Sequence, residues 1–93
     1  MIRSFRSLEA ERIWLGEVSR KLPIDIQATA LRKLRMLNNA VLPRDLAVPP
    51  NNGLEALKHD RKGQYSMRVN DQWCICFRWT EGGPADVEIV DYH

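Results

Sequence analysis

The chain ends in Asp91, Tyr92 and His93, which carry a carboxylate, a phenol and an imidazole in succession. An imidazole exchanges protons near neutral pH and a nearby carboxylate can orient it, so this tail is a candidate for general acid–base chemistry. Simpler interpretations of the same residues remain open: a histidine at a frayed end, a partly buried tyrosine and an aspartate in a turn.

Basic residues gather in the second half of the chain. Lys58, Arg61 and Lys62 follow one another closely, and Arg68 and Arg78 occupy polar positions in two segments where polar and apolar residues alternate. Such alternation is typical of strands, so both guanidinium groups are expected on one face of a sheet, where they require solvent or an anion. A polyanion is therefore a candidate partner, and a solvated charged surface is the alternative interpretation.

Length and composition limit the classes of protein to which the chain can belong. With 93 residues, we expect a single domain spanning residues 1–93. Hydrophobic residues make up 44% and charged residues 28%, which is typical of globular proteins and excludes a disordered chain. No apolar run has the roughly 20 residues of a membrane-spanning helix, and no secretory signal is predicted. Cys74 and Cys76 have no further cysteine as a partner, which favours the reducing cytoplasm.

The first half of the chain predicts two helices after a short first strand at residues 2–5. Ser7 is a candidate N-cap, and apolar residues at three- and four-residue spacing predict a helix that continues to about Leu22. A second helix is predicted over residues 25–37. Its inner face is expected to carry Ala30, Leu31, Leu34 and Leu37, and its outer face Arg32, Lys33 and Arg35. Residues 40–53 are rich in proline and predict an irregular connector with one helical turn.

The second half predicts strands joined by short turns. The predicted strands cover residues 54–57, 65–69, 73–79 and 86–91, with turns at residues 70–71 and 81–84. Short turns imply antiparallel pairing. An aromatic stripe of Trp73, Phe77 and Trp79 is expected to face the core, and Cys74 and Cys76 to lie on the opposite face. The predicted fold class is α+β, with two N-terminal helices packed on one face of a small antiparallel sheet.

Several segments resemble the HigB toxins, a branch of the RelE/ParE superfamily of bacterial toxin–antitoxin systems. The resemblance covers nearly the whole chain, in order and without large gaps. Its most specific parts are the terminal Asp-Tyr-His and the block from Lys58 to Trp79. Further matching segments are residues 2–5, 32–34, 54–57 and 87–90. The resemblance implies the RelE-like fold, in which two N-terminal helices pack on a small curved antiparallel sheet.

The resemblance also implies an activity, which is ribosome-dependent cleavage of mRNA. In this reaction a ribose 2′-OH attacks the adjacent phosphate, which requires a base, an acid and a cation for the developing charge. The family implies no metal and no cofactor, and the sequence has no His/Cys cluster with metal-ligand spacing. The family's catalytic positions fall on Lys58, Asp91, Tyr92 and His93, and its RNA-binding positions on Arg61, Lys62, Arg68 and Arg78.

The partners implied by the resemblance are a HigA-like helix-turn-helix antitoxin and the 70S ribosome with its mRNA. Operator DNA is expected to be bound only through the antitoxin complex, no membrane partner is expected, and the location is cytoplasmic. Two other classes stay open: a toxin of the same fold that poisons DNA gyrase, and a binding module that engages only antitoxin and DNA. The terminal Asp91-Tyr92-His93 favours the ribonuclease, because a gyrase poison needs no proton-transfer tail.

The sequence departs from the family pattern at two positions. Many relatives carry arginine directly after the aromatic residue of the third strand, where this chain has Cys74. Loss of a cation that contacts the transition state can cost two or more orders of magnitude in rate, so an attenuated variant is a further alternative. Some relatives carry histidine where this chain has Glu55, so Glu55 is not expected to act as the proton shuttle.

Overall fold

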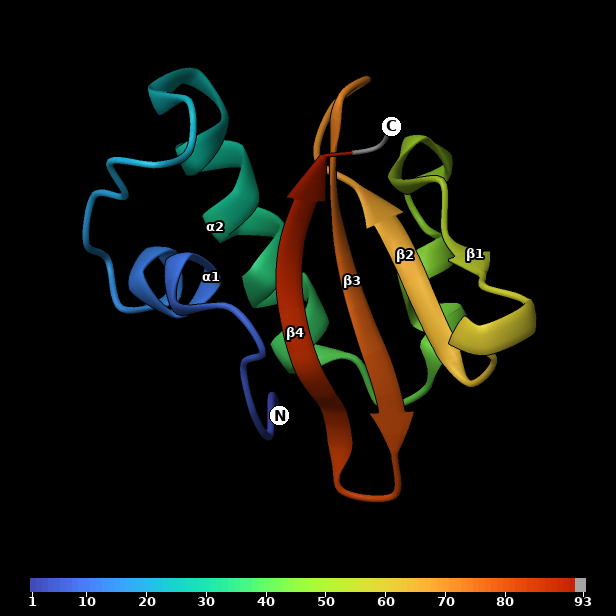
Figure 1. Cartoon of the computed structure of the whole chain (residues 1–93). Coiled ribbons are helices and arrows are strands. Elements are labelled where there is room, and N and C mark those ends of the chain that lie inside the picture. The colour runs from blue at the N-terminus through green and yellow to red at the C-terminus, as the bar shows by residue number, and fades with distance from the viewer. Residues whose placement is uncertain (92–93) are drawn as a thin grey trace.

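The computed structural model describes residues 1–91, and the predicted catalytic residues Tyr92 and His93 lie outside the described part. Two α-helices precede a four-stranded antiparallel sheet in which the strands follow one another in sequence order (Figure 1). The predicted α+β class is therefore confirmed. The elements in chain order are α1 (Leu8–Trp14), α2 (Ile24–Asn39), η1 (Pro43–Ala47), η2 (Pro50–Asn52), β1 (Glu55–Ala56), η3 (His59–Arg61), β2 (Gln64–Arg68), β3 (Trp73–Thr80) and β4 (Gly83–Asp91).

Short turns join the strands, as the sequence predicts. Between β2 and β3 the side-chain oxygen of Asn70 accepts hydrogen bonds from the backbone N–H groups of Gln72 and Trp73, which closes the turn. Between β3 and β4 the strands pair up to Thr80 and Gly83. The predicted start of the last strand at residue 86 is therefore wrong. Gly83 and Pro84, which were expected in the turn, are paired with β3 instead.

The hydrophobic core lies between the helices and one face of the sheet. Figure 1 shows α1 and α2 on the same side of the strands. Phe77 is fully buried, and Trp73 and Trp79 are partly buried against the core, so the aromatic stripe faces the core as predicted. The other large core side chains with no exposed surface are Leu34, Leu37, Met67, Ile75 and Val87.

The first helix is shorter than the sequence predicts. It begins after the N-cap Ser7, whose side chain accepts the Ala10 N–H, and it ends at Trp14. Gly16 has a φ of 83°, a left-handed conformation that a helix cannot continue through. Val18, which the periodicity placed on the helix stripe, is 65% exposed. The apolar spacing after Trp14 thus does not reflect a helix.

The second helix differs from the prediction on its outer face. Arg32 and Arg35 are exposed, but Lys33 is only 5% exposed. Its ammonium group donates a hydrogen bond to the side-chain oxygen of Asn52, which the connector brings over the helix. Burial, followed by the nearby Arg32 charge, lowers the pKa of Lys33. The prediction that Lys33 lies on the outer, solvated face of the helix is therefore wrong, because helical periodicity does not show where a distant loop folds back.

The segments around the sheet are irregular. The predicted first strand is reduced to a single parallel bridge between Phe5 and Val87. The predicted helical turn of the connector is present as η1. Within residues 1–91, no helix combines the length and apolar character needed to cross a membrane.

Candidate active site

The sheet face opposite the helices carries the groups that can do chemistry. Strand alternation turns every second side chain toward this face. The pairing register then sets them side by side, because Ser66 on β2 and Glu88 on β4 both lie opposite Cys76 on β3, and Val90 lies opposite Cys74. Ser66, Cys74 and Cys76 are each no more than 4% exposed, although they point away from the helical core.

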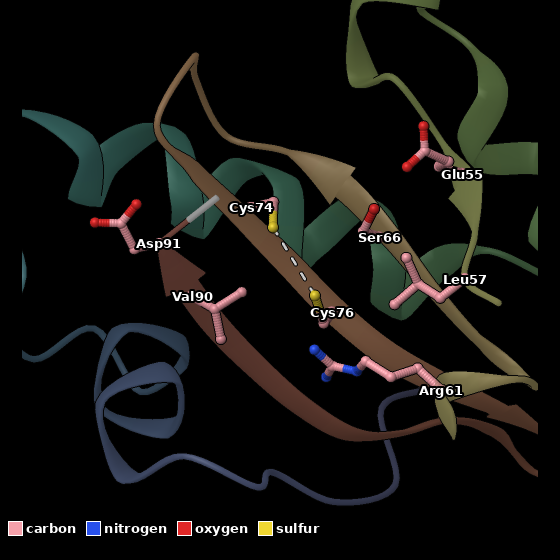
Figure 2. A pocket seen from close by; sticks show the side chains of 8 residues that line it. All are labelled: Glu55, Leu57, Arg61, Ser66, Cys74, Cys76, Val90 and Asp91. Atoms are coloured by element: carbon pink, nitrogen blue, oxygen red, sulfur yellow. Dashed lines mark hydrogen bonds between the residues drawn. The ribbon is translucent and has the colours of Figure 1, made fainter. Parts of the chain in front are cut away.

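A pocket of about 290 Å³ lies over these residues. The chain between β1 and β2 forms one wall and brings Arg61 toward Cys76, while β4 ends at the opposite wall with Asp91 (Figure 2). The residues that line the pocket are Glu55, Leu57, Arg61, Ser66, Cys74, Cys76, Val90 and Asp91. The pocket is thus formed by all four strands and the η3 segment.

Arg61 is held over the sheet by two side chains. Its Nη2 lies 3.1 Å from the Gln64 Oε1 and 3.1 Å from the Glu88 Oε2. Glu88 is only 16% exposed and also meets Arg6, whose Nη1 lies 3.9 Å away. Because a planar guanidinium with two fixed acceptors loses much of its freedom, Arg61 presents a positioned cation to the pocket.

Cys74 and Cys76 form the floor of the pocket. Their sulfur atoms are 3.8 Å apart and share a hydrogen bond (Figure 2). This contact, followed by burial, raises the pKa of the Cys74 thiol. The same contact, assisted by the Arg61 charge, lowers the pKa of the Cys76 thiol against the effect of burial. Both cysteines are free thiols, so the floor carries two adjacent sulfur atoms.

The structure brings some of the predicted site residues together and leaves others apart. Arg61 and Asp91 line the same pocket, and the Asp91 carboxylate accepts a hydrogen bond of 3.1 Å from Gln72. Lys58 and Lys62 are exposed at the two ends of η3, next to Arg61 in the chain.

The two predicted arginines of the strands lie outside this pocket. Arg68 lines a neighbouring hollow and packs against Gly53, where an added Cβ would come within 3.1 Å of the Arg68 side chain. The Arg78 Nε lies 3.1 Å from the Asp86 carboxylate. These cations therefore surround the pocket along the same sheet.

Two acidic residues of the site were not among the predicted functional residues. Glu88 holds Arg61 and lies opposite Cys76 in the pairing of β3 with β4. Glu55 also lines the pocket, at the position where the family resemblance implies a histidine in some relatives. Among the described lining residues, Glu55 and Asp91 are acidic and Arg61 is basic, so the interior of the pocket carries no excess of positive charge.

Comparison with known proteins shows the family to which the chain belongs. Residues 3–93 match the family described as the RelE-like toxin of type II toxin-antitoxin system HigB. The chain belongs to the HigB-like toxins. Such toxins are one half of a toxin–antitoxin pair, so an antitoxin protein is the partner that the family implies.

Two individual proteins are similar to the chain. The chain is 40% identical over 82 residues to Toxin HigB-1 of Vibrio cholerae serotype O1, an alignment that covers 82% of this chain and 86% of the relative. It is 36% identical over 64 residues to an uncharacterized protein of Haemophilus influenzae, covering 69% of this chain and 63% of that protein. The family thus extends across most of the chain, including the strands that form the pocket.

Proposed function

We propose that this HigB-like toxin is a metal-independent endoribonuclease that cleaves mRNA on the ribosome and so inhibits translation. The observation that carries the proposal is the pocket that joins Arg61 to the end of β4. The last described residue, Asp91, lines this pocket, and the proton-capable residues Tyr92 and His93 are the next two in the sequence. The terminal Asp-Tyr-His and a positioned guanidinium supply the groups that cleavage next to a ribose 2′-OH requires.

The proposed roles follow from the chemistry of each group. His93 transfers the proton, Asp91 orients it or a neighbouring cation, and Tyr92 stacks on the mRNA or hydrogen-bonds to it. Lys58 lies exposed at the start of η3 and is the proposed catalytic lysine. Arg61 faces the developing negative charge from inside the pocket. The surrounding cations Lys62, Arg68 and Arg78 are proposed to contact RNA phosphates.

The proposed partners are the 70S ribosome with its mRNA and a HigA-like helix-turn-helix antitoxin, with operator DNA bound through the antitoxin complex. The site of action is the bacterial cytoplasm. A second candidate, an attenuated toxin that mainly binds antitoxin, is favoured by one observation. Cys74 occupies the pocket floor at the position where the family resemblance implies an arginine, and Arg61 is the basic residue among the described lining residues.

Translation in vitro followed by primer extension tests the proposal. We expect cuts within codons that appear only when protein, ribosomes and message are all present. Naked message with the same protein is the control and should stay intact. Absence of cuts on translated message, together with relaxed DNA cleaved by gyrase in the presence of the protein, would support the gyrase poison instead. Absence of both activities would favour the attenuated form.

A further inference from the structure

Glu88 places a carboxylate beside the guanidinium that is proposed to face the developing negative charge. Its Oε2 lies 3.1 Å from the Arg61 Nη2 and 3.9 Å from the Arg6 Nη1. Glu88 lies opposite Cys76 in the pairing of β3 with β4, so the strand keeps it next to the pocket floor. Only 16% of its side chain is exposed, so water screens its charge poorly. An acid at this place would by itself repel an RNA phosphate, and its presence therefore needs an explanation.

We propose that Glu88 is a positioning residue for RNA cleavage that acts through Arg61. The carboxylate fixes the guanidinium over the pocket, and the guanidinium in turn covers the charge of the carboxylate. This inference rests on the proposed ribonuclease function. Because a charge-assisted hydrogen bond is about twice as strong as a neutral one, Glu88 constrains Arg61 more firmly than Gln64 does. A cation that is already in place stabilises the transition state without a cost of reorganisation.

The two charges of the pair act on the pocket floor in opposite directions. The contact with Cys74 lowers the pKa of the Cys76 thiol most strongly and burial opposes it, while the Arg61 charge lowers this pKa further and the Glu88 charge raises it. No other described residue of the pocket lining is basic, so removal of Arg61 leaves the Glu88 charge uncovered there. Arg6 is a weak substitute, because it is 3.9 Å away and its side chain is 61% exposed.

Single-turnover cleavage of ribosome-bound message by four proteins tests the inference: the unmodified chain, Glu88→Gln, Arg61→Ala and the double variant. Glu88→Gln keeps the size of the side chain and one acceptor but removes the charge. We expect the cleavage rate at saturation to fall about tenfold while the KM for programmed ribosomes stays unchanged, because the lost interaction belongs to the transition state. In the Arg61→Ala protein the same substitution should instead raise the rate about fivefold, because an uncovered carboxylate no longer opposes the developing charge.

This reversal of sign separates a positioning role from a structural one. If Glu88 only supported the fold, its substitution would lower the cleavage rate in both backgrounds, together with the melting temperature. That result would overturn the inference. An unchanged rate in Glu88→Gln, or a double variant that cleaves no faster than Arg61→Ala, would overturn it as well.

Asp86→Asn is the matched control, because it removes the same charge from a second arginine–carboxylate pair of the sheet. The Asp86 carboxylate lies 3.1 Å from the Arg78 Nε, and asparagine accepts the positive φ of 53° at this position. Both side chains of this pair are about half exposed, so we expect the cleavage rate to stay within about twofold in either background. If Asp86→Asn restored cleavage to Arg61→Ala as well as Glu88→Gln does, the effect would be one of net charge and the inference would fail.

Nuclear magnetic resonance of the Arg61 guanidinium tests the positioning without ribosomes or RNA. A guanidinium held by Glu88 and Gln64 should rotate slowly about its Nε–Cζ bond and give separate Nη signals, which should merge in Glu88→Gln. Merged signals in the unmodified protein would overturn the inference, whether or not the variants fold. If the unmodified protein cleaved no translated message, the proposed ribonuclease function would fail instead, and separate Nη signals would still show that Glu88 fixes Arg61.

Discussion

Cys74 is 4% exposed on the pocket floor, with Arg68 directly opposite it on β2 and Val90 opposite it on β4. A side chain at this position points into the pocket and away from the helical core, so a longer one extends over Glu55 and Asp91. The choice of residue at position 74 therefore affects the pocket and has little effect on the packing of the helical core.

We predict that Cys74→Arg increases ribosome-dependent cleavage about tenfold, which corresponds to about 1.4 kcal/mol of transition-state stabilisation. The new guanidinium adds donors that act on charge present only in the transition state. The new arginine lies opposite Arg68 on β2, and the repulsion between the two charges should cost about 0.2–1 kcal/mol of folding free energy. Primer extension and thermal unfolding of both proteins check this. A folded variant that cleaves no faster would show that this position is not a lost catalytic cation.

Lys58→Ala should reduce cleavage about 100-fold or more while leaving the free energy of unfolding unchanged within about 0.5 kcal/mol. The lysine is exposed at the start of η3, so its removal uncovers little apolar surface. Arg35→Ala, an exposed cation on α2, is the matched control and should retain full activity. Equal effects of the two substitutions on cleavage would remove Lys58 from the site and point to a general loss of positive charge.

At the scale of the elements, the fold depends on how the N-terminal segment and the connector dock against the strands and helices. The N-terminal segment runs along the start of β4, where the Arg3 N–H donates to the Pro84 carbonyl at 2.7 Å. The connector reaches α2 through Asn52, which accepts from the buried Lys33 and donates to the Leu46 carbonyl at 3.0 Å. The Arg3–Pro84 and Lys33–Asn52 contacts join residues that are distant in the sequence, whereas the Asn52–Leu46 contact holds the connector to itself.

Gly83→Ala should destabilise the fold more than Gly63→Ala does. Both glycines have positive φ, 122° and 90°, so each alanine costs backbone strain of about 1–2 kcal/mol. A Cβ at residue 63 meets open space, whereas a Cβ at residue 83 would lie 2.3 Å from the Met1 carbonyl oxygen. Urea unfolding of the two variants measures the difference. Equal losses of unfolding free energy in the two variants would show that the N-terminal segment moves away from residue 83 without loss of stability.

Lys33→Met should remove a rise in stability at alkaline pH. Burial lowers the pKa of Lys33 in the folded chain, so the unfolded chain binds this proton more tightly. Between the lowered pKa and the ordinary value of 10.5, the unfolded state carries more protons and the free energy of unfolding rises with pH. Urea unfolding from pH 7 to pH 10.5 should show that the free energy of unfolding of the unmodified protein, minus that of Lys33→Met, increases with pH. A constant difference would contradict the lowered pKa.

At the scale of the whole molecule, the core and the proposed catalytic residues at the end of the chain can be tested separately. The buried hydrophobic cluster extends from Ala10 to Ile89, and β4 ends at Asp91 on the pocket wall. Deletion of Tyr92 and His93 should therefore abolish growth inhibition and cleavage, while the melting temperature shifts by only a few degrees. Toxicity that persists in a well-expressed truncated protein would refute the role of the tail. Loss of the fold would show that the tail is structural.

The sequence by itself determined those features that depend on local periodicity and turn chemistry. The alternation along β3 placed Phe77 in the core and Cys74 and Cys76 on the opposite face, because side chains of a strand alternate with a period of two. The same reasoning placed Asn70 in a turn, and it predicted antiparallel pairing from the short connections. The order of motifs also identified the toxin family, which the comparison confirmed.

Only the tertiary structure decided which distant groups meet. The η3 segment folds back over the sheet, so Arg61 reaches Glu88 across 27 positions of sequence, and Asn52 buries Lys33 on the helix face expected to be solvated. Periodicity contains no information on such contacts, because they depend on loop paths that nonlocal packing selects. It also could not show that α1 stops at Trp14, since Val18, which is exposed, repeats the spacing of a buried stripe.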